Sequence, residues 1–167
     1  MSEALCTSCG MCCDGTLFSH VPLAATELDA AKAVGLPVVA VTGGQGFVQP
    51  CPQLGADCGC AIYPVRPGVC RRFRCTTLRA FEAGEIDFAA ARSRIDSARG
   101  AIALLRRSCR TGAEVPAIRR ELYAAGKAVE PTRMVALGAL ERLLDRNFRL
   151  RGQQAFNPDQ AAETSSP

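Results

Sequence analysis

Nine of the ten cysteines in this 167-residue chain lie before residue 76. Four of them fall in the eight-residue run CTSCGMCC, and five more follow in the segment CPQLGADCGCAIYPVRPGVCRRFRC. Prolines interrupt the second segment so often that regular secondary structure is not expected there. Apolar burial alone cannot hold together a loop-rich lobe of about 70 residues, because small domains of this kind need disulfides or metal ions.

The cellular compartment decides between disulfides and metal. The N-terminus lacks a basic segment followed by an apolar run, and no apolar stretch approaches the ~18 residues that span a membrane. We therefore expect a cytoplasmic protein without membrane contact, in which thiols stay reduced and serve as metal ligands or redox groups. A structural zinc site contributes on the order of 10 kcal/mol, against ~5–15 kcal/mol for the net stability of a domain. Metal would therefore decide whether the first half folds.

The cysteine spacing fits metal ligation. Cys6, Cys9 and Cys12 form a C-x-x-C-x-x-C run, which grips tetrahedral zinc or an Fe–S cluster. Adjacent side chains diverge, so the vicinal cysteines Cys12 and Cys13 are expected to have different functions. One thiol would bind the same metal as Cys6 and Cys9, and the other would bind a second centre or act as a redox thiol. The candidate ligands are Cys6, Cys9, Cys12, Cys13, Cys51, Cys58, Cys60, Cys70 and Cys75. They suffice for two four-thiolate sites with one to spare.

The first half also contains one predicted helix and one predicted hairpin. Thr26 is placed to cap a helix over ELDAAKAVG, with Asp29 in a capping box and Gly35 as the stop. The segment PVVAVTGGQGFVQPCP predicts two short strands around a Gly-Gly turn, with Cys51 at the end of the hairpin.

The second half has a helical pattern. A short helix ends at Gly84, Asp87 can cap a long one, and Pro116 and Pro131 fit the first turns of two more, the former ending at Gly126. The predicted apolar positions are Phe88, Ala91, Ile95, Ala98, Ile102, Leu105 and Cys109, then Ile118, Leu122 and Ala125, then Val135, Leu137, Leu140, Leu144 and Phe148. We expect a mainly α chain: an irregular cysteine-rich metal-binding lobe with a short β-hairpin over 1–76, a bundle of three to four helices packed on it over 77–150, and a flexible tail over 151–167.

The cysteine motifs also resemble a known family. The run CxxCGxCC, followed by CPxL and then by CxIYxxRPxxCRxFxC, is similar to that of the YkgJ-type cysteine-cluster proteins, or CxxCxxCC proteins. These are described as zinc- or iron-chelating domains and are sometimes labelled Fe–S oxidoreductases. The resemblance covers residues 6 to 75 and implies metal binding by the candidate cysteines other than Cys58, which departs from the family pattern. It leaves open whether zinc, iron or an Fe–S cluster is bound, and which of Cys58 and Cys60 is a ligand.

Four further residues bear on the site. Arg66 and Arg71 stand among the last ligands, match the RPxxCR segment, and could offset thiolate charge around a cofactor. His20 is the one histidine and lies outside every cysteine interval, so a surface or capping role is favoured over ligation. Cys109 continues a helical apolar stripe and behaves as a small hydrophobe.

Charge and motifs exclude several functional classes. The net charge of +4 comes almost entirely from arginines spread among acids, which is typical of a solvated helical surface rather than of a nucleic-acid interface. The chain contains no GxxxxGK[ST], GxSxG or HExxH motif. The leading hypothesis is a metal-chelating protein that binds zinc or iron through thiolates, with a protein partner docking on the helical half. An Fe–S redox protein and a zinc-stabilised interaction module are the alternatives, and whether the chain is an enzyme stays open.

Overall fold

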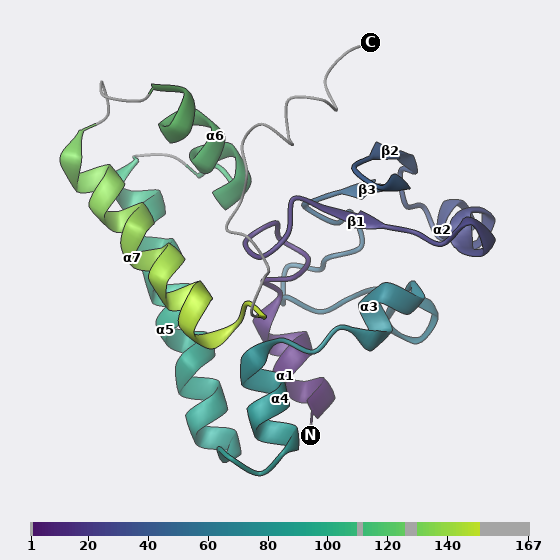
Figure 1. Cartoon of the computed structure of the whole chain (residues 1–167), viewed down its shortest axis with the longest axis horizontal. Coiled ribbons are helices and arrows are strands. Elements are labelled where there is room, and N and C mark those ends of the chain that lie inside the picture. Colours follow the sequence, from purple (N-terminus) through teal and green to yellow (C-terminus); the bar gives the residue numbers. More distant parts are fainter. Residues whose placement is uncertain (1, 110–111, 126–129, 151–167) are drawn as a thin grey trace. The chain divides into compact units, whose positions relative to one another are not determined.

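The structure is a computed structural model that describes residues 2–109, 112–125 and 130–150 (Figure 1). The chain divides into two compact units. One runs from Cys6 to Phe73 and is called the cysteine lobe below. The other begins at Arg74, includes the first residues up to Leu5, and is called the helical unit. None of the helices in the described ranges combines the length and apolar character needed to cross a lipid bilayer. Gly126 and the tail expected over 151–167 lie outside the described residues.

The cysteine lobe joins short elements by long loops. Helix α1 leads into it, and a three-stranded antiparallel sheet of order β1-β3-β2 follows. The elements are α1 (Ser2–Cys9), β1 (His20–Pro22), the 3-10 helix η1 (Ala25–Glu27), α2 (Leu28–Ala33), β2 (Val39–Val41), β3 (Gly44–Val48), the 3-10 helix η2 (Tyr63–Val65) and α3 (Gly68–Arg72). In Figure 1 the three strands lie next to α2 within this lobe.

The sheet and α2 enclose a small apolar core. The predicted hairpin is confirmed, because Val41 pairs with Gly44 around a two-residue turn. Strand β1 pairs with the other edge of β3, where Val21 lies opposite Phe47. The buried core residues of the lobe are Val21, Ala31, Leu36 and Phe47. The partly buried side chains of Cys51 and Cys70 pack against this core. The core is small and includes cysteines at its margin, as expected for a lobe that apolar burial alone does not stabilise.

Some sequence expectations for the lobe were wrong. Thr26 does not cap α2, because residues 25–27 tighten into η1 and α2 starts after Glu27, which makes no side-chain capping bond. The Glu27 carboxylate instead accepts a hydrogen bond from the Gly68 N–H at 2.6 Å. Helices α1 and α3 and strand β1 were not predicted, because each is too short to show a convincing period.

The helical unit contains α4 (Thr76–Glu82), α5 (Phe88–Ser108), α6 (Val115–Ala125) and α7 (Pro131–Asn147). Asp87 caps α5 as predicted, since its carboxylate accepts the Ala90 N–H at 2.7 Å. Helix α5 packs along α7, and α6 contacts both (Figure 1). The structure therefore confirms a mainly α chain in which a cysteine-rich region with a short hairpin precedes a group of packed helices.

Most predicted apolar positions in these helices are buried. The buried residues are Ala91, Ile95, Ala98, Ile102 and Leu105 on α5, Ile118 and Leu122 on α6, Leu137, Leu140 and Leu144 on α7, and Phe148 after it. The predictions for Phe88, Ala125 and Val135 were wrong, because these residues are exposed. Phe88 begins α5 and Ala125 ends α6, whereas Val135 lies one turn into α7 on its exposed side, next to the buried Ala136. Cys109 ends α5 half-buried.

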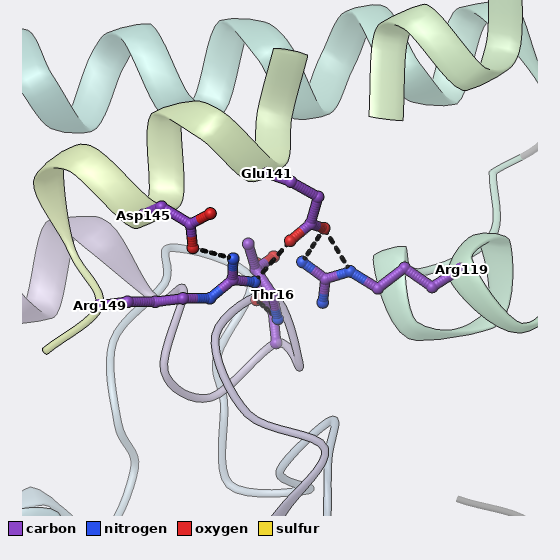
Figure 2. Close-up of polar contacts among 6 residues, drawn as sticks. Thr16, Arg119, Glu141, Asp145 and Arg149 are labelled. Atoms are coloured by element: carbon purple, nitrogen blue, oxygen red, sulfur yellow. Dashed lines mark hydrogen bonds and ion pairs between the residues drawn. The ribbon is translucent and has the colours of Figure 1, made fainter. Parts of the chain in front are cut away.

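A buried ionic network joins α6 to α7 (Figure 2). Arg119 donates to one carboxylate oxygen of Glu141 at 2.7 Å, and Arg149 donates to the other at 2.7 Å. Arg149 also donates to Asp145 at 2.7 Å. The Arg119 side chain is only 1% exposed and that of Glu141 13%. Glu141 is thus shared by two arginines inside the helical unit.

Candidate metal centre

Cys13, Cys51, Cys60 and Cys70 gather in the cysteine lobe and form the group called the four-thiol cluster below. Backbone contacts bring these distant positions together. The Cys51 N–H donates to the carbonyl of Cys13 at 2.7 Å. Leu54 donates to the Cys51 carbonyl at 3.1 Å and pairs with Cys60 in an isolated antiparallel bridge. Cys70 packs against the same core as Cys51.

The pKa values of the cluster thiols reflect first their burial and then their neighbouring thiols. Burial, reinforced by the neighbouring thiols of Cys51, Cys60 and Cys70, raises the pKa of Cys13 to about 12. Burial and the thiols of Cys51 and Cys60 raise the pKa of Cys70 to about 11. The pKa of Cys51 is also raised, first by burial, although the Gln53 N–H opposes the shift. Partly buried thiols that disfavour one another's ionisation in this way need a cation to become thiolates together.

Two charged residues border the cluster. The Arg66 guanidinium lowers the pKa of Cys70, opposing the larger effects of burial and of the other thiols. Its Nη1 donates to the Tyr63 carbonyl at 2.7 Å, and its carbon Cζ lies 3.5 Å from the centre of the Tyr63 ring. The Glu27 carboxylate acts on Cys70 in the opposite direction. Arg71 lies exposed on α3, and its role at the site stays a prediction.

The remaining cysteines of the lobe are Cys6 and Cys9 on α1, Cys12 in the turn that follows this helix, and Cys58. Cys6 is exposed, whereas Cys9, Cys12 and Cys58 are partly buried. Between Cys9 and Cys12, Gly10 adopts a φ of +70°, and its carbonyl accepts the Cys13 N–H at 2.8 Å. Cys58 comes close to this turn: a Cβ built on Gly10 would lie 3.4 Å from the Cys58 Sγ.

Three other residues considered from sequence lie elsewhere. Cys75 belongs to the helical unit, where its Sγ accepts the Leu78 N–H at 3.4 Å and caps α4. Burial raises its pKa, which neighbouring N–H groups lower. His20 lies half-buried in β1, with its Nδ1 3.0 Å from the Ser19 hydroxyl. The Cys109 Sγ lies 3.8 Å from the Ser108 hydroxyl at the end of α5.

The four thiols lie in one region of the lobe, but their sulfur atoms are not arranged around a single point. None of the ten cysteines, all of which lie within the described residues, forms a disulfide. In the same part of the chain, no three His, Cys, Asp or Glu side chains stand close enough together to hold one metal ion. A metal ion would therefore require thiols of the group to turn between staggered rotamers. The donor set fits a thiophilic metal, because the four candidate ligands of the group are all thiols and none is a histidine.

Sequence reasoning missed two polar residues that build the site. Gln49 is buried, and its side-chain amide donates to the Cys12 carbonyl at 3.0 Å. Glu27 binds the first residue of α3 through the Gly68 N–H and thereby positions the helix that carries Cys70. No sequence signal pointed to either residue: Gln49 lies inside the predicted hairpin segment, and the partner of Glu27 lies 41 residues along the chain.

The comparisons with known proteins agree with this chemistry. The sequence signature of the CxxCxxCC family, described as a "putative zinc- or iron-chelating domain", matches residues 5–94. No curated protein and no solved structure matches the chain. The matched segment contains the whole cysteine lobe and exceeds half of the chain. With its thiols grouped in that segment, the chain belongs to the CxxCxxCC family of zinc- or iron-chelating domains.

Proposed function

We propose that this protein binds zinc or iron through thiolates, and that the four-thiol cluster is its principal site. The observation that carries the proposal is the grouping of these four cysteines: backbone bonds tie Cys51 to Cys13 and, through Leu54, to Cys60, and Cys70 packs against the same core as Cys51. These thiols come from four loops and short elements, so an ion bound by all four would tie the lobe together. Such a site supplies folding free energy directly, because the ligands are not assembled in the unfolded chain.

Charge compensation supports the proposal. Four thiolates around a divalent ion leave a net charge of about −2, which needs hydrogen-bond donors or cations nearby. Arg66 supplies one cation, fixed in place by its bond to the Tyr63 carbonyl and its stacking on the ring. The Gln53 N–H, which lowers the pKa of Cys51, supplies a donor near a second sulfur. The chain's own residues would thus bind the ion, hold the ligands deprotonated and offset their charge.

Iron in an Fe–S cluster is the second candidate. The run of Cys6, Cys9 and Cys12 has the C-x-x-C-x-x-C spacing that also holds such clusters. In that case the function would be electron transfer or a redox reaction, and cysteines of the same lobe would be the cluster ligands. Both candidates require a reducing compartment, and we propose the cytoplasm. That a protein partner docks on the helical unit stays a prediction.

Metal analysis of the full chain, purified without air, tests the proposal. Zinc, iron and acid-labile sulfide are counted per chain for the wild type, Cys70→Ser and Cys109→Ser. We expect stoichiometric zinc, or iron with sulfide and a brown colour, in the wild type and in Cys109→Ser. Cys70→Ser should lose metal from the four-thiol cluster. The matched control is informative because both cysteines are half-buried and sit on or next to a helix, yet Cys109 lies in the helical unit. Wild-type protein that neither contains nor takes up zinc or iron would refute the proposal.

A further inference from the structure

Cys58 has an unusual backbone conformation. Its φ is 67°, and it is the one non-glycine residue with a positive φ in the part of the chain that the structure describes. An L-residue in this conformation is strained, and glycine would avoid that strain. Strain held at a chemically reactive side chain points to a role for that side chain. Cys58 also stands outside the CxxCGxCC, CPxL and CxIYxxRPxxCRxFxC pattern, so the family resemblance gives it no role.

The strained loop places Cys58 against the N-terminal turn. A Cβ on Gly10 would lie only 3.0 Å from the Cys58 Cβ and 3.4 Å from its Sγ. Gly10 is the residue that directly follows Cys9 and turns the chain towards Cys12, so the Cys58 thiol lies beside this turn. On α1, Cys6 and Cys9 are three residues apart, so they share one helix face.

These thiols are distinct from the four-thiol cluster. Cys13 is tied to that cluster by the hydrogen bond from the Cys51 N–H. The preceding residue, Cys12, is held through its carbonyl by the Gln49 side chain. Since neighbouring side chains diverge, we expect the Cys12 thiol to point away from that of Cys13. The alternative fourth ligand, Cys75, belongs to the helical unit, where its Sγ caps α4.

We infer that Cys58 completes a second thiolate centre with Cys6, Cys9 and Cys12, and that this centre takes a thiophilic metal ion. The inference rests on the proposed function, because it assumes that the lobe binds metal through thiolates. It goes further in dividing the eight thiols of the lobe into two sites and in giving the strained Cys58 the place of a ligand. The vicinal cysteines then separate the two sites, with Cys12 in one and Cys13 in the other.

Titration with Co²⁺ alone tests the inference on the reduced, metal-free full chain without air. The readout is the number of equivalents at which the sulfur-to-cobalt charge-transfer absorption saturates. Wild type and Cys109→Ser should both bind two equivalents of Co²⁺. In Cys58→Ser and Cys58→Gly, one equivalent should bind with the full absorption of four thiolates. The second equivalent should either not bind or show the weaker absorption of three thiolates. Cys58→Gly guards against misfolding, because glycine relieves the backbone strain while removing the thiol.

Each other result has a defined meaning. Two equivalents of Co²⁺ with full absorption in both Cys58 variants would overturn the inference. If Cys75→Ser then bound only one equivalent, Cys75 would be the fourth ligand of the second centre. One equivalent in the wild type, abolished in Cys70→Ser, would overturn the second centre but support the proposed function. No binding of Co²⁺ by the wild type would remove both.

Discussion

Cys51 donates its backbone N–H to the carbonyl oxygen of Cys13 at 2.7 Å. The bond joins the loop after β3 to the N-terminal turn and sets two candidate ligands side by side. Because this contact is between loops, its persistence depends on what else ties the two loops together. A metal ion shared by both cysteines is the obvious tie, since apolar burial in this lobe is limited.

Metal removal should therefore loosen this contact selectively. We expect a chelator, added with reductant, to accelerate amide hydrogen exchange in peptides that cover β3 and the loop after it. Peptides from the middle of α5 should exchange at nearly unchanged rates, because their hydrogen bonds are internal to a long packed helix. Hydrogen exchange with mass spectrometry checks both. Equal protection of the loop with and without metal would argue against a structural ion at the four-thiol cluster.

Metal affinity should depend steeply on pH. The pKa of Cys13 is raised to about 12 and that of Cys70 to about 11, from an ordinary value of 9.0. Both thiols are therefore protonated at pH 7, in the folded lobe and in an unfolded chain alike, and metal binding must release their protons. Acidification then weakens binding and alkalinisation strengthens it, by up to about four log units per pH unit for a four-thiolate site.

Competition with a chromophoric zinc chelator between pH 6 and 8 measures this slope. The protonation of the competing chelator is corrected in a parallel titration without protein. A slope below about two would mean that at most half of the expected thiols bind as thiolates. That outcome would contradict the four-thiol cluster as the ligand set.

The close approach of Cys58 predicts an asymmetry between two glycine substitutions. Gly43→Ala should cost roughly 1–2 kcal/mol, because Gly43 has a φ of +90° but nothing lies within 4 Å of the new Cβ. Gly10→Ala should cost about 1–3 kcal/mol more, because its φ is +70° and its Cβ would press on Cys58. Denaturant unfolding of the metal-loaded variants measures both costs. Equal losses of stability would place Cys58 away from the turn.

Local patterns predicted the helices better than they predicted the site. The α5 stripe from Ala91 to Leu105 was predictable because its period lies within one helix. The burial of Arg119 was not, because it depends on Glu141, 22 residues away on another helix. Strand β1 was not predicted for the same reason, because three residues ending in proline form a strand only by pairing with β3.

The candidate ligands could be named from their spacing, but their grouping could not. C-x-x-C spacing places Cys6 near Cys9 through local geometry alone. The association of Cys13 with Cys51 arises from a hydrogen bond between distant loops, and that of Cys51 with Cys70 from packing against one shared core. The divergence expected of Cys12 and Cys13 was a sequence argument, yet the partner of each depends on the fold.

Arg66 should tune the affinity of the four-thiol cluster. Its guanidinium favours the Cys70 thiolate, so Arg66→Gln should weaken Zn²⁺ binding by roughly tenfold or more. Arg120→Gln removes the same charge from an exposed position on α6 and serves as the control. Zinc competition at a fixed pH compares the two variants with the wild type. Equal affinities in Arg66→Gln and Arg120→Gln would show that Arg66 contributes only its general positive charge.

The shared carboxylate of Glu141 should dominate the stability of the helical unit. Glu141→Gln leaves the buried guanidiniums of Arg119 and Arg149 without their common counter-charge, so we expect a loss of about 3–5 kcal/mol. Asp145→Asn should cost under about 1 kcal/mol, because the Asp145 side chain is 55% exposed and water can replace it. Thermal unfolding of the two variants in metal-loaded protein measures the difference. Similar midpoints for both would mean that solvent reaches Arg119 and Arg149, and that the network is a surface feature.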